Sequence, residues 1–212
     1  GYGMTETAAT LCFSTNRVPE MIPLPRNNIK VLDIDTGKEL GYDQDGEICV
    51  TSPTLMIGYY KNEDATKEII FEANGVRWLR TGDLGHITPE GYFHLTGRIK
   101  RIFWGIGPDN TPYRIYPMEI ERVLCTCPEV ENCAVIGKPN GERGYLPIAY
   151  VVPAPSADRS RLEELLGQLC KKELHGNAVP YAYHFVDRLP TTPAGKVDFR
   201  ALERMAAKEY GK

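Results

Sequence analysis

Long apolar stretches, an excess of basic residues and a dense set of cysteines are all missing from this sequence of 212 residues. No apolar run approaches the roughly 20 residues of a membrane-spanning helix, and we expect no signal peptide. The 25 Lys and Arg residues are outnumbered by 28 Asp and Glu, which gives a net charge of -3 and an isoelectric point near 5.9. Because nucleic acids and anionic membranes require a basic surface, we expect neither as a partner. We also expect a cytoplasmic protein.

The cysteines are too sparse for a disulfide scaffold. Cys125 and Cys127 are separated by a single residue, which is the wrong spacing for a zinc knuckle, and no second Cys or His pair completes such a site. We therefore expect six reduced, partly buried thiols: Cys12, Cys49, Cys125, Cys127, Cys133 and Cys170.

The first half of the chain is typical of short strands joined by turns. Alternating or apolar runs bounded by Gly, Asp and Pro predict strands at 29–34, 46–51, 76–79 and 92–96, with one short helix at 63–70. Together they predict a small β-rich, barrel-like subdomain over residues 1–97. The pattern changes after Gly97, and we place the domain boundary there.

The second half, residues 98–212, alternates strands with amphipathic helices. Apolar runs predict strands at 133–137, 148–152 and 183–186, and apolar residues at helical spacing predict helices at 117–127, around 160–170 and after Asp198. Pro117 suits a first helical turn, Ser160 with Glu163 forms a candidate capping box, and Asp198 can cap the last helix. The fold class is therefore α+β, with a compact α+β domain following the β-rich subdomain.

The opening segment, Gly1 to Thr7, carries three side chains suited to a nucleotide. Tyr2 could stack on a base, Thr5 could donate to a phosphate oxygen, and Glu6 could hold Mg²⁺ together with phosphate oxygens. The plain alternative is an ordinary loop at the end of the chain.

Three further segments carry charged side chains that suit a nucleotide. Asp83, beside a glycine, could accept both hydroxyls of a ribose, or it could bond its own backbone in a turn. Lys196 lies on a Pro/Gly loop and offers a compact ammonium to a developing negative charge, although most loop lysines are simply solvated. A basic cluster that includes Arg98 and Lys100 lies at the domain boundary and could meet a phosphate or ribose, or remain a solvated surface.

Taken together and in this order, these segments resemble the adenylate-forming superfamily of acyl-CoA synthetases, peptide-synthetase adenylation domains and luciferases. YGMTET is similar to the family's YGxTE segment, and WLRTGDLG to its TGD segment. GEICVTSPTLMIGYYKNEDAT, GRIKRIFWGIG with YRIYPMEIE, and LPTTPAGKVDFRAL resemble three further family segments. The resemblance covers residues 1 to 202, nearly the whole chain.

The resemblance implies a two-step reaction in which a carboxylate attacks the α-phosphate of ATP and a thiol, that of CoA, then takes the acyl group. It implies that Tyr2 packs on adenine, Thr5 touches the α-phosphate and Glu6 binds Mg²⁺. Asp83 matches the ribose-binding aspartate, and Arg98 matches a second ribose or phosphate contact.

For the C-terminal domain, the resemblance implies a mobile unit that swings at a hinge matching Lys100. Lys196 matches the catalytic lysine that bridges carboxylate and α-phosphate oxygens during adenylation. Gly105 and Gly107 match the glycine-containing segment that faces the thiol, where glycine leaves room for a pantetheine arm.

Two departures from the family pattern bear on function. Residues 108–114 lengthen the segment after Gly107, which leaves open which glycine lines the thiol tunnel. The family's Ser/Thr/Gly-rich phosphate loop does not occur, so we expect this chain to be the last third of a longer enzyme, with the N-terminal domain and most of the acyl pocket upstream.

We expect an AMP-forming acyl-CoA synthetase that acts on fatty or other small carboxylic acids. Two alternatives stay open: a ligase that loads the phosphopantetheine of a carrier protein, and a non-catalytic binding module if the chain acts alone.

Overall fold

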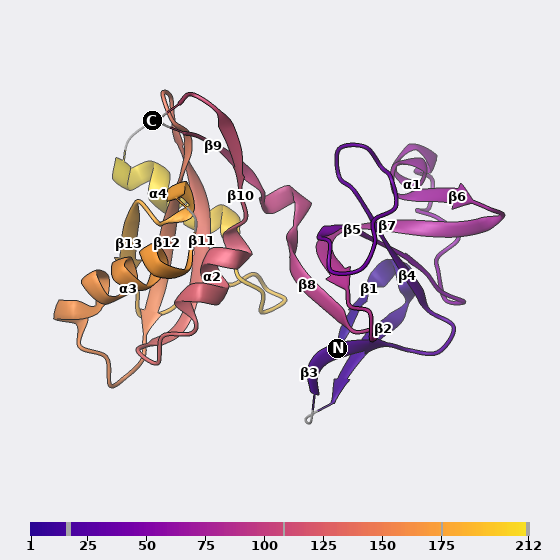
Figure 1. The fold of residues 1–212 in the computed structure, drawn as a ribbon, viewed down its shortest axis with the longest axis horizontal. Coiled ribbons are helices and arrows are strands. Elements are labelled where there is room, and N and C mark those ends of the chain that lie inside the picture. Colours follow the sequence, from indigo (N-terminus) through magenta and orange to yellow (C-terminus); the bar gives the residue numbers. More distant parts are fainter. Residues whose placement is uncertain (16–17, 108, 175, 211–212) are drawn as a thin grey trace. The chain divides into compact units, whose positions relative to one another are not determined.

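The computed structural model describes residues 1–15, 18–107, 109–174 and 176–210. The chain divides into two compact units, Gly1–Lys100 and Arg101–Lys212, each of which has its own sheet (Figure 1). Each unit also has its own hydrophobic core. In the part of the chain described, no helix is both long and apolar enough to cross a membrane.

The first unit is built on an antiparallel sheet with the order β1-β2-β3-β8-β7-β5-β4, and β6 pairs with β7. The structure also has a short helix, α1 (Glu63–Ile69), which the Asn62 side chain caps by accepting from the Ala65 N–H, and a 3-10 turn, η1 (Thr5–Thr7). The strands are β1 (Tyr2–Met4), β2 (Ala9–Thr15), β3 (Val18–Pro23), β4 (Asn28–Leu32), β5 (Gly46–Thr51), β6 (Ile70–Ala73), β7 (Val76–Ile87) and β8 (Phe93–Arg98).

This sheet curls around a single core. Tyr2 on β1 and Val31 on β4 lie on strands at opposite ends of the pairing order, yet both belong to one buried cluster with Ile48 and Leu79. A flat sheet could not bring its two ends to one core, so the unit has the barrel-like form that the sequence predicts. The strand expected at 76–79 is much longer than predicted, and the pattern did not predict the three strands within residues 2–23.

The second unit contains a five-stranded sheet with the order β10-β9-β12-β11, and β13 pairs parallel to β12. Its strands are β9 (Phe103–Ile106), β10 (Pro112–Ile115), β11 (Val130–Asn140), β12 (Gly144–Pro153) and β13 (Ala182–Phe185). Its helices are α2 (Pro117–Leu124), α3 (Arg159–Glu173) and α4 (Phe199–Tyr210), with 3-10 turns η2 (Ile99–Arg101), which spans the boundary, and η3 (Gly176–Ala178).

Helices cover both faces of the central strands of this sheet. Cys133 and Val135 on β11 belong to a core cluster with α2 and α3, whereas the alternating residues Ala134 and Ile136 belong to a second cluster with α4. Because both faces are buried, β11 and β12 each contain a continuous apolar run, at 133–136 and 148–152, rather than an alternating one. The α+β class predicted from the sequence is confirmed.

The helix caps show where local sequence signals sufficed. Asp198 caps α4 as predicted, because its Oδ1 accepts from the Ala201 N–H at 3.0 Å. The prediction of Ser160 as a cap was wrong: Asp158 is the N-cap of α3, and its Oδ1 accepts from the Ser160 N–H at 3.0 Å. Both residues are good caps by type, and the carboxylate two residues earlier takes the position.

Candidate nucleotide and acyl-transfer sites

Asp83 lies on a bulge within β7, not in the turn that the sequence suggested. Glu47 pairs with Leu84 and Cys49 with Arg80, so the single residue between them on β5 faces three residues on β7. Gly82 at the centre has a φ of 69°, a conformation that favours glycine. The Thr81 hydroxyl secures the bulge by donating to the Ile48 carbonyl at 2.8 Å and accepting from the Asp83 N–H at 3.0 Å. Such bulges re-aim a side chain, here that of Asp83.

Two donors from distant parts of the chain meet the Asp83 carboxylate. The Tyr2 hydroxyl donates to Oδ2 at 2.8 Å, and the Arg98 Nε lies 2.8 Å from Oδ1. The Asp83 side chain is only 1% exposed, whereas that of Arg98 is 61% exposed. Burial is the main cause of a raised pKa for Tyr2, which therefore remains a protonated donor.

The structure thus brings together three of the residues that the sequence proposed for a nucleotide. Tyr2 is 8% exposed and packs against Phe93, with ring centroids 5.0 Å apart, so most of its ring lies in the core. Its hydroxyl is engaged by Asp83. Of the two side chains that contact Asp83, Arg98 is the one that is largely exposed to solvent.

Thr5 and Glu6 lie together on η1, and a loop from later in the chain is bonded to this turn. The Glu6 carbonyl accepts from the Met56 N–H at 2.8 Å, and the Tyr59 hydroxyl donates to Glu6 Oε1 at 2.7 Å. That hydrogen bond is the main cause of a raised pKa for Tyr59. Thr5 is exposed. Sequence reasoning missed Tyr59, although it lies within the GYYKNEDAT motif.

Glu6 fits a site for Mg²⁺ that is completed by phosphate oxygens and water. The carboxylate is partly exposed and keeps Oε2 available beside the bonded Oε1. Within the described residues no three His, Cys, Asp or Glu side chains gather to hold a metal. Mg²⁺ usually takes one or two carboxylates and keeps its remaining positions for phosphate and water, which agrees with a single Glu.

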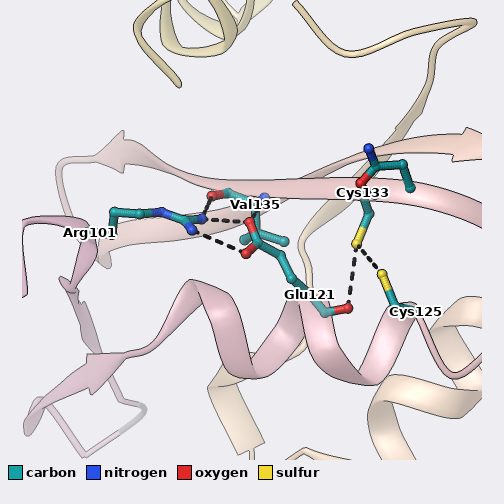
Figure 2. A network of polar contacts seen from close by, with 6 residues as sticks. Arg101, Glu121, Cys125, Cys133 and Val135 are labelled. Carbon is teal, nitrogen blue, oxygen red and sulfur yellow. Dashed lines mark hydrogen bonds and ion pairs between the residues drawn. The ribbon is translucent and has the colours of Figure 1, made fainter. Parts of the chain in front are cut away.

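The basic cluster at the boundary is divided between the two units. Arg98 pairs with Asp83, and Lys100 is exposed at the end of the first unit. In the second unit, Arg101 contacts both oxygens of Glu121 at 2.5 and 3.2 Å and donates to the Val135 carbonyl, as Figure 2 shows. Its guanidinium also lies 3.9 Å from the ring centroid of Phe199 on α4. Arg101 therefore ties the start of the second unit to that unit's own core.

The two candidate glycines of the thiol tunnel occupy different surroundings. Gly105 pairs with Tyr113 across β9 and β10, and a Cβ added to Gly105 would lie 2.3 Å from the Tyr113 ring. Glycine is therefore needed there for Tyr113 to lie across the strand. Gly107 instead lines a cavity of about 340 Å³ together with Tyr113, Arg143 and Tyr181.

Lys196 follows a tight loop in the second unit. The Thr192 N–H donates to the Lys196 carbonyl at 2.7 Å, and the Gly195 N–H donates to the Thr192 carbonyl at 2.9 Å. Gly195 has a φ of 75°. The lysine side chain is exposed, on a backbone that these hydrogen bonds hold in place.

Comparison with known proteins assigns the family. The profile "AMP-binding enzyme" matches residues 1–60 and the profile "AMP-binding enzyme C-terminal domain" matches residues 119–196. A luciferin 4-monooxygenase of Nipponoluciola cruciata is 33% identical over all of this chain and 38% of its own length. A long-chain-fatty-acid–CoA ligase of Escherichia coli O157:H7 is 35% identical over 95% of this chain and 35% of its own.

A solved structure agrees with these sequence matches. ATP-bound MatB from Rhodopseudomonas palustris is 33% identical and has a TM-score of 0.82, over all of this chain and 41% of MatB. The chain therefore spans 35% to 41% of the length of these three relatives. On these matches, which include both parts of the family's architecture, the chain belongs to the AMP-binding, adenylate-forming enzyme superfamily.

Proposed function

We propose that this chain is the C-terminal part of an AMP-forming acyl-CoA synthetase acting on a fatty or other small carboxylic acid. The carboxylate oxygen attacks the α-phosphorus of ATP, and the bond to the β-phosphate breaks to release pyrophosphate. The thiol of CoA then attacks the acyl carbon of the adenylate, and AMP leaves. The observation that carries the proposal is the buried Asp83 carboxylate, which a bulge aims at Tyr2 and the exposed Arg98.

In the proposed adenylation site, Asp83 accepts the ribose hydroxyls and Arg98 makes a second contact to the ribose or phosphate. Tyr2 orients Asp83 through its hydroxyl and is the residue proposed to pack on the adenine. Thr5 donates to the α-phosphate. Glu6 would hold Mg²⁺, which supplies positive charge to the phosphate oxygens when bound.

The second unit is proposed to supply the lysine that acts during adenylation and the tunnel through which the acceptor thiol enters. Lys196 places its ammonium between carboxylate and α-phosphate oxygens, where charge develops during adenylation. Lys100 is the proposed hinge. Gly107 is the better-supported wall of the thiol tunnel because it lines an open cavity, whereas Tyr113 covers Gly105.

A carrier-protein ligase is the second candidate. The cavity beside Gly107 is lined by Arg143, and a cation there would suit either a phosphate of CoA or an acidic carrier surface. Comparing thioester formation with free CoA and with a phosphopantetheine-bearing carrier separates the two acceptors.

Substitution of Lys196 in the whole enzyme tests the proposal. We expect Lys196→Ala to lower the rate of adenylation on the order of 10²–10³-fold, by analogy with the loss of one donor to a developing charge. Thioester formation from a pre-made acyl-adenylate should change far less, because the lysine acts at the first step only.

Matched variants sharpen this test. Lys208→Ala, which removes an exposed lysine from α4, should leave both steps unchanged. Lys196→Arg should not restore the full rate, because a planar guanidinium differs from an ammonium in shape and reach. An equal loss at both steps in Lys196→Ala would show that the residue acts through folding.

The chain by itself is not expected to catalyse adenylation. An ATP–pyrophosphate exchange assay that compares the 212-residue chain with the whole enzyme tests this expectation. Exchange by the chain alone would instead favour a self-sufficient adenylation site.

A further inference from the structure

Two cysteines of the second unit lie within reach of each other. The Sγ atoms of Cys125 and Cys133 are 3.5 Å apart, across the interface between the end of α2 and strand β11 (Figure 2). All six cysteines are free thiols, as the sequence predicts. Cys125 is the exposed one among them, and the other five are buried.

The two sulfurs differ in their surroundings. The Cys133 thiol lies 3.5 Å from the Glu121 carbonyl oxygen and donates to it, which leaves its sulfur as the acceptor for the Cys125 thiol. Burial raises the pKa of Cys133, so this thiol keeps its proton. Cys125, at the C-cap of α2, faces solvent and can meet a reagent first.

Closing the pair needs only a small movement. A disulfide has sulfurs about 2.05 Å apart, so they would have to approach by roughly 1.5 Å. Cys125 lies just beyond the last turn of α2 and is exposed, so its side chain can rotate without displacing a packed core group. Cys127, two residues along, is buried in the core cluster instead.

We propose that Cys125 and Cys133 form a reversible dithiol–disulfide modification site, in which exposed Cys125 takes up the oxidant and buried Cys133 closes the bond. The oxidant is a small disulfide of the glutathione class. The Cys125 thiolate attacks one of its sulfurs, the S–S bond breaks, and one small thiolate leaves.

In the second step the Cys133 sulfur attacks the Cys125 sulfur of this mixed disulfide. The Cys133 thiol releases its proton as the new S–S bond forms, the bond to the small sulfur breaks, and that sulfur takes up a proton and leaves as the second small thiol. The protein dithiol loses two electrons and two protons in total, and the small disulfide becomes two thiols. Closing the bond also removes the Cys133 donor from Glu121, the residue whose carboxylate holds Arg101.

Intact-mass spectrometry of the folded chain after treatment with oxidised glutathione tests the proposal. The unsubstituted protein should lose about 2 Da and retain no adduct, and a dithiol reductant should reverse the change. Cys133→Ser should accumulate one glutathione adduct on Cys125, because the second step is blocked. Cys125→Ser should react on the order of tenfold more slowly, because the remaining thiols are buried.

Peptide mapping and a matched control locate the bond. Cleavage after Glu129 and Glu131 separates Cys133 from Cys125 in the sequence, so the two peptides should stay joined until they are reduced. Cys127→Ser should behave as the unsubstituted protein does. A stable glutathione adduct on the unsubstituted protein, or a crosslink that requires Cys127, would overturn the proposal.

Discussion

The two arginines that flank Lys100 make opposite kinds of ion pair. Arg98 belongs to the first unit: its side chain is 61% exposed and contacts, through one nitrogen, a carboxylate that is 1% exposed. Arg101 belongs to the second unit: it is 19% exposed, meets Glu121 with two nitrogens and lies against Phe199. Both carboxylates accept a further donor from their own unit, the Tyr2 hydroxyl in one and the Val135 N–H in the other.

The two ion pairs therefore have different roles, although Arg98 and Arg101 lie only three positions apart in the sequence. The Arg101 pair is bidentate and enclosed, which is the geometry of a structural anchor. The Arg98 pair leaves its guanidinium in solvent, where a ligand can reach it. Each pair lies inside one unit, so a reorientation at Lys100, as proposed, would break neither of them.

The largest expected effect is the loss of the enclosed pair. Arg101→Ala leaves the Glu121 carboxylate without its cation, and we expect the second unit to lose about 3 kcal/mol of unfolding free energy. Denaturant unfolding followed by the fluorescence of Trp104, with Trp78 replaced by Phe, reports on that unit. Arg122→Ala, which removes an exposed arginine from α2, is the control and should change little.

The next effect concerns the shared carboxylate of the first unit. Asp83→Ala leaves the buried Tyr2 hydroxyl without its acceptor, which should cost about 2 kcal/mol in unfolding free energy. Trp78 fluorescence in a Trp104→Phe background measures this unit. Glu90→Ala, in an exposed turn, provides the comparison. An unchanged unfolding midpoint would mean that the Tyr2–Asp83 contact contributes nothing to stability.

Alkaline pH should distinguish Tyr2 from exposed tyrosines. Its raised pKa means that the folded unit keeps a proton that the unfolded chain releases above about pH 10. Tyr2 therefore leaves the free energy of unfolding unchanged below about pH 10. Above that pH it lowers this free energy by about 1.4 kcal/mol per pH unit. Tyr2→Phe should show a shallower fall than the unsubstituted protein, whereas Tyr42→Phe, at an exposed site, should not.

The smallest effect should come from the exposed arginine. Arg98→Ala is expected to lower the stability of the first unit by less than about 1 kcal/mol, because Tyr2 still donates to Asp83 and loss of a largely exposed side chain opens the carboxylate to water. The same Trp78 measurement applies. A loss as large as that of Arg101→Ala would mean that both arginines are structural and that the contrast between them is wrong.

Local signals in the sequence predicted much of the fold. Asp198 caps α4 through a contact three residues away, which the sequence displays directly. The apolar runs on β11 and β12 were recognisable because both faces of those strands are buried. The bulge at Gly82 was not predictable, because it depends on which residues of β5 lie opposite.

The candidate site was predictable in its residue types and not in its contacts. Motif resemblance assigned Tyr2, Asp83 and Arg98 each a contact to one nucleotide, which stays a prediction. It did not predict that Tyr2 and Arg98 both contact Asp83. The hydrogen bond between Tyr2 and Asp83 spans 81 positions and follows only from the curling of the sheet. Tyr59 was missed because its partner, Glu6, lies 53 positions away.

By itself, the sequence determined the family, the α+β class and the residue types available for chemistry, because motifs and periodicity are local properties. Only the tertiary structure decided which carboxylate each arginine meets, how deeply Tyr2 is buried, and that Cys125 faces Cys133 rather than its neighbour Cys127. These outcomes depend on how α2 packs on β11 and how the first sheet closes around its core. Such packing brings together residues that are far apart in the sequence, and their distance in space cannot be read from that separation.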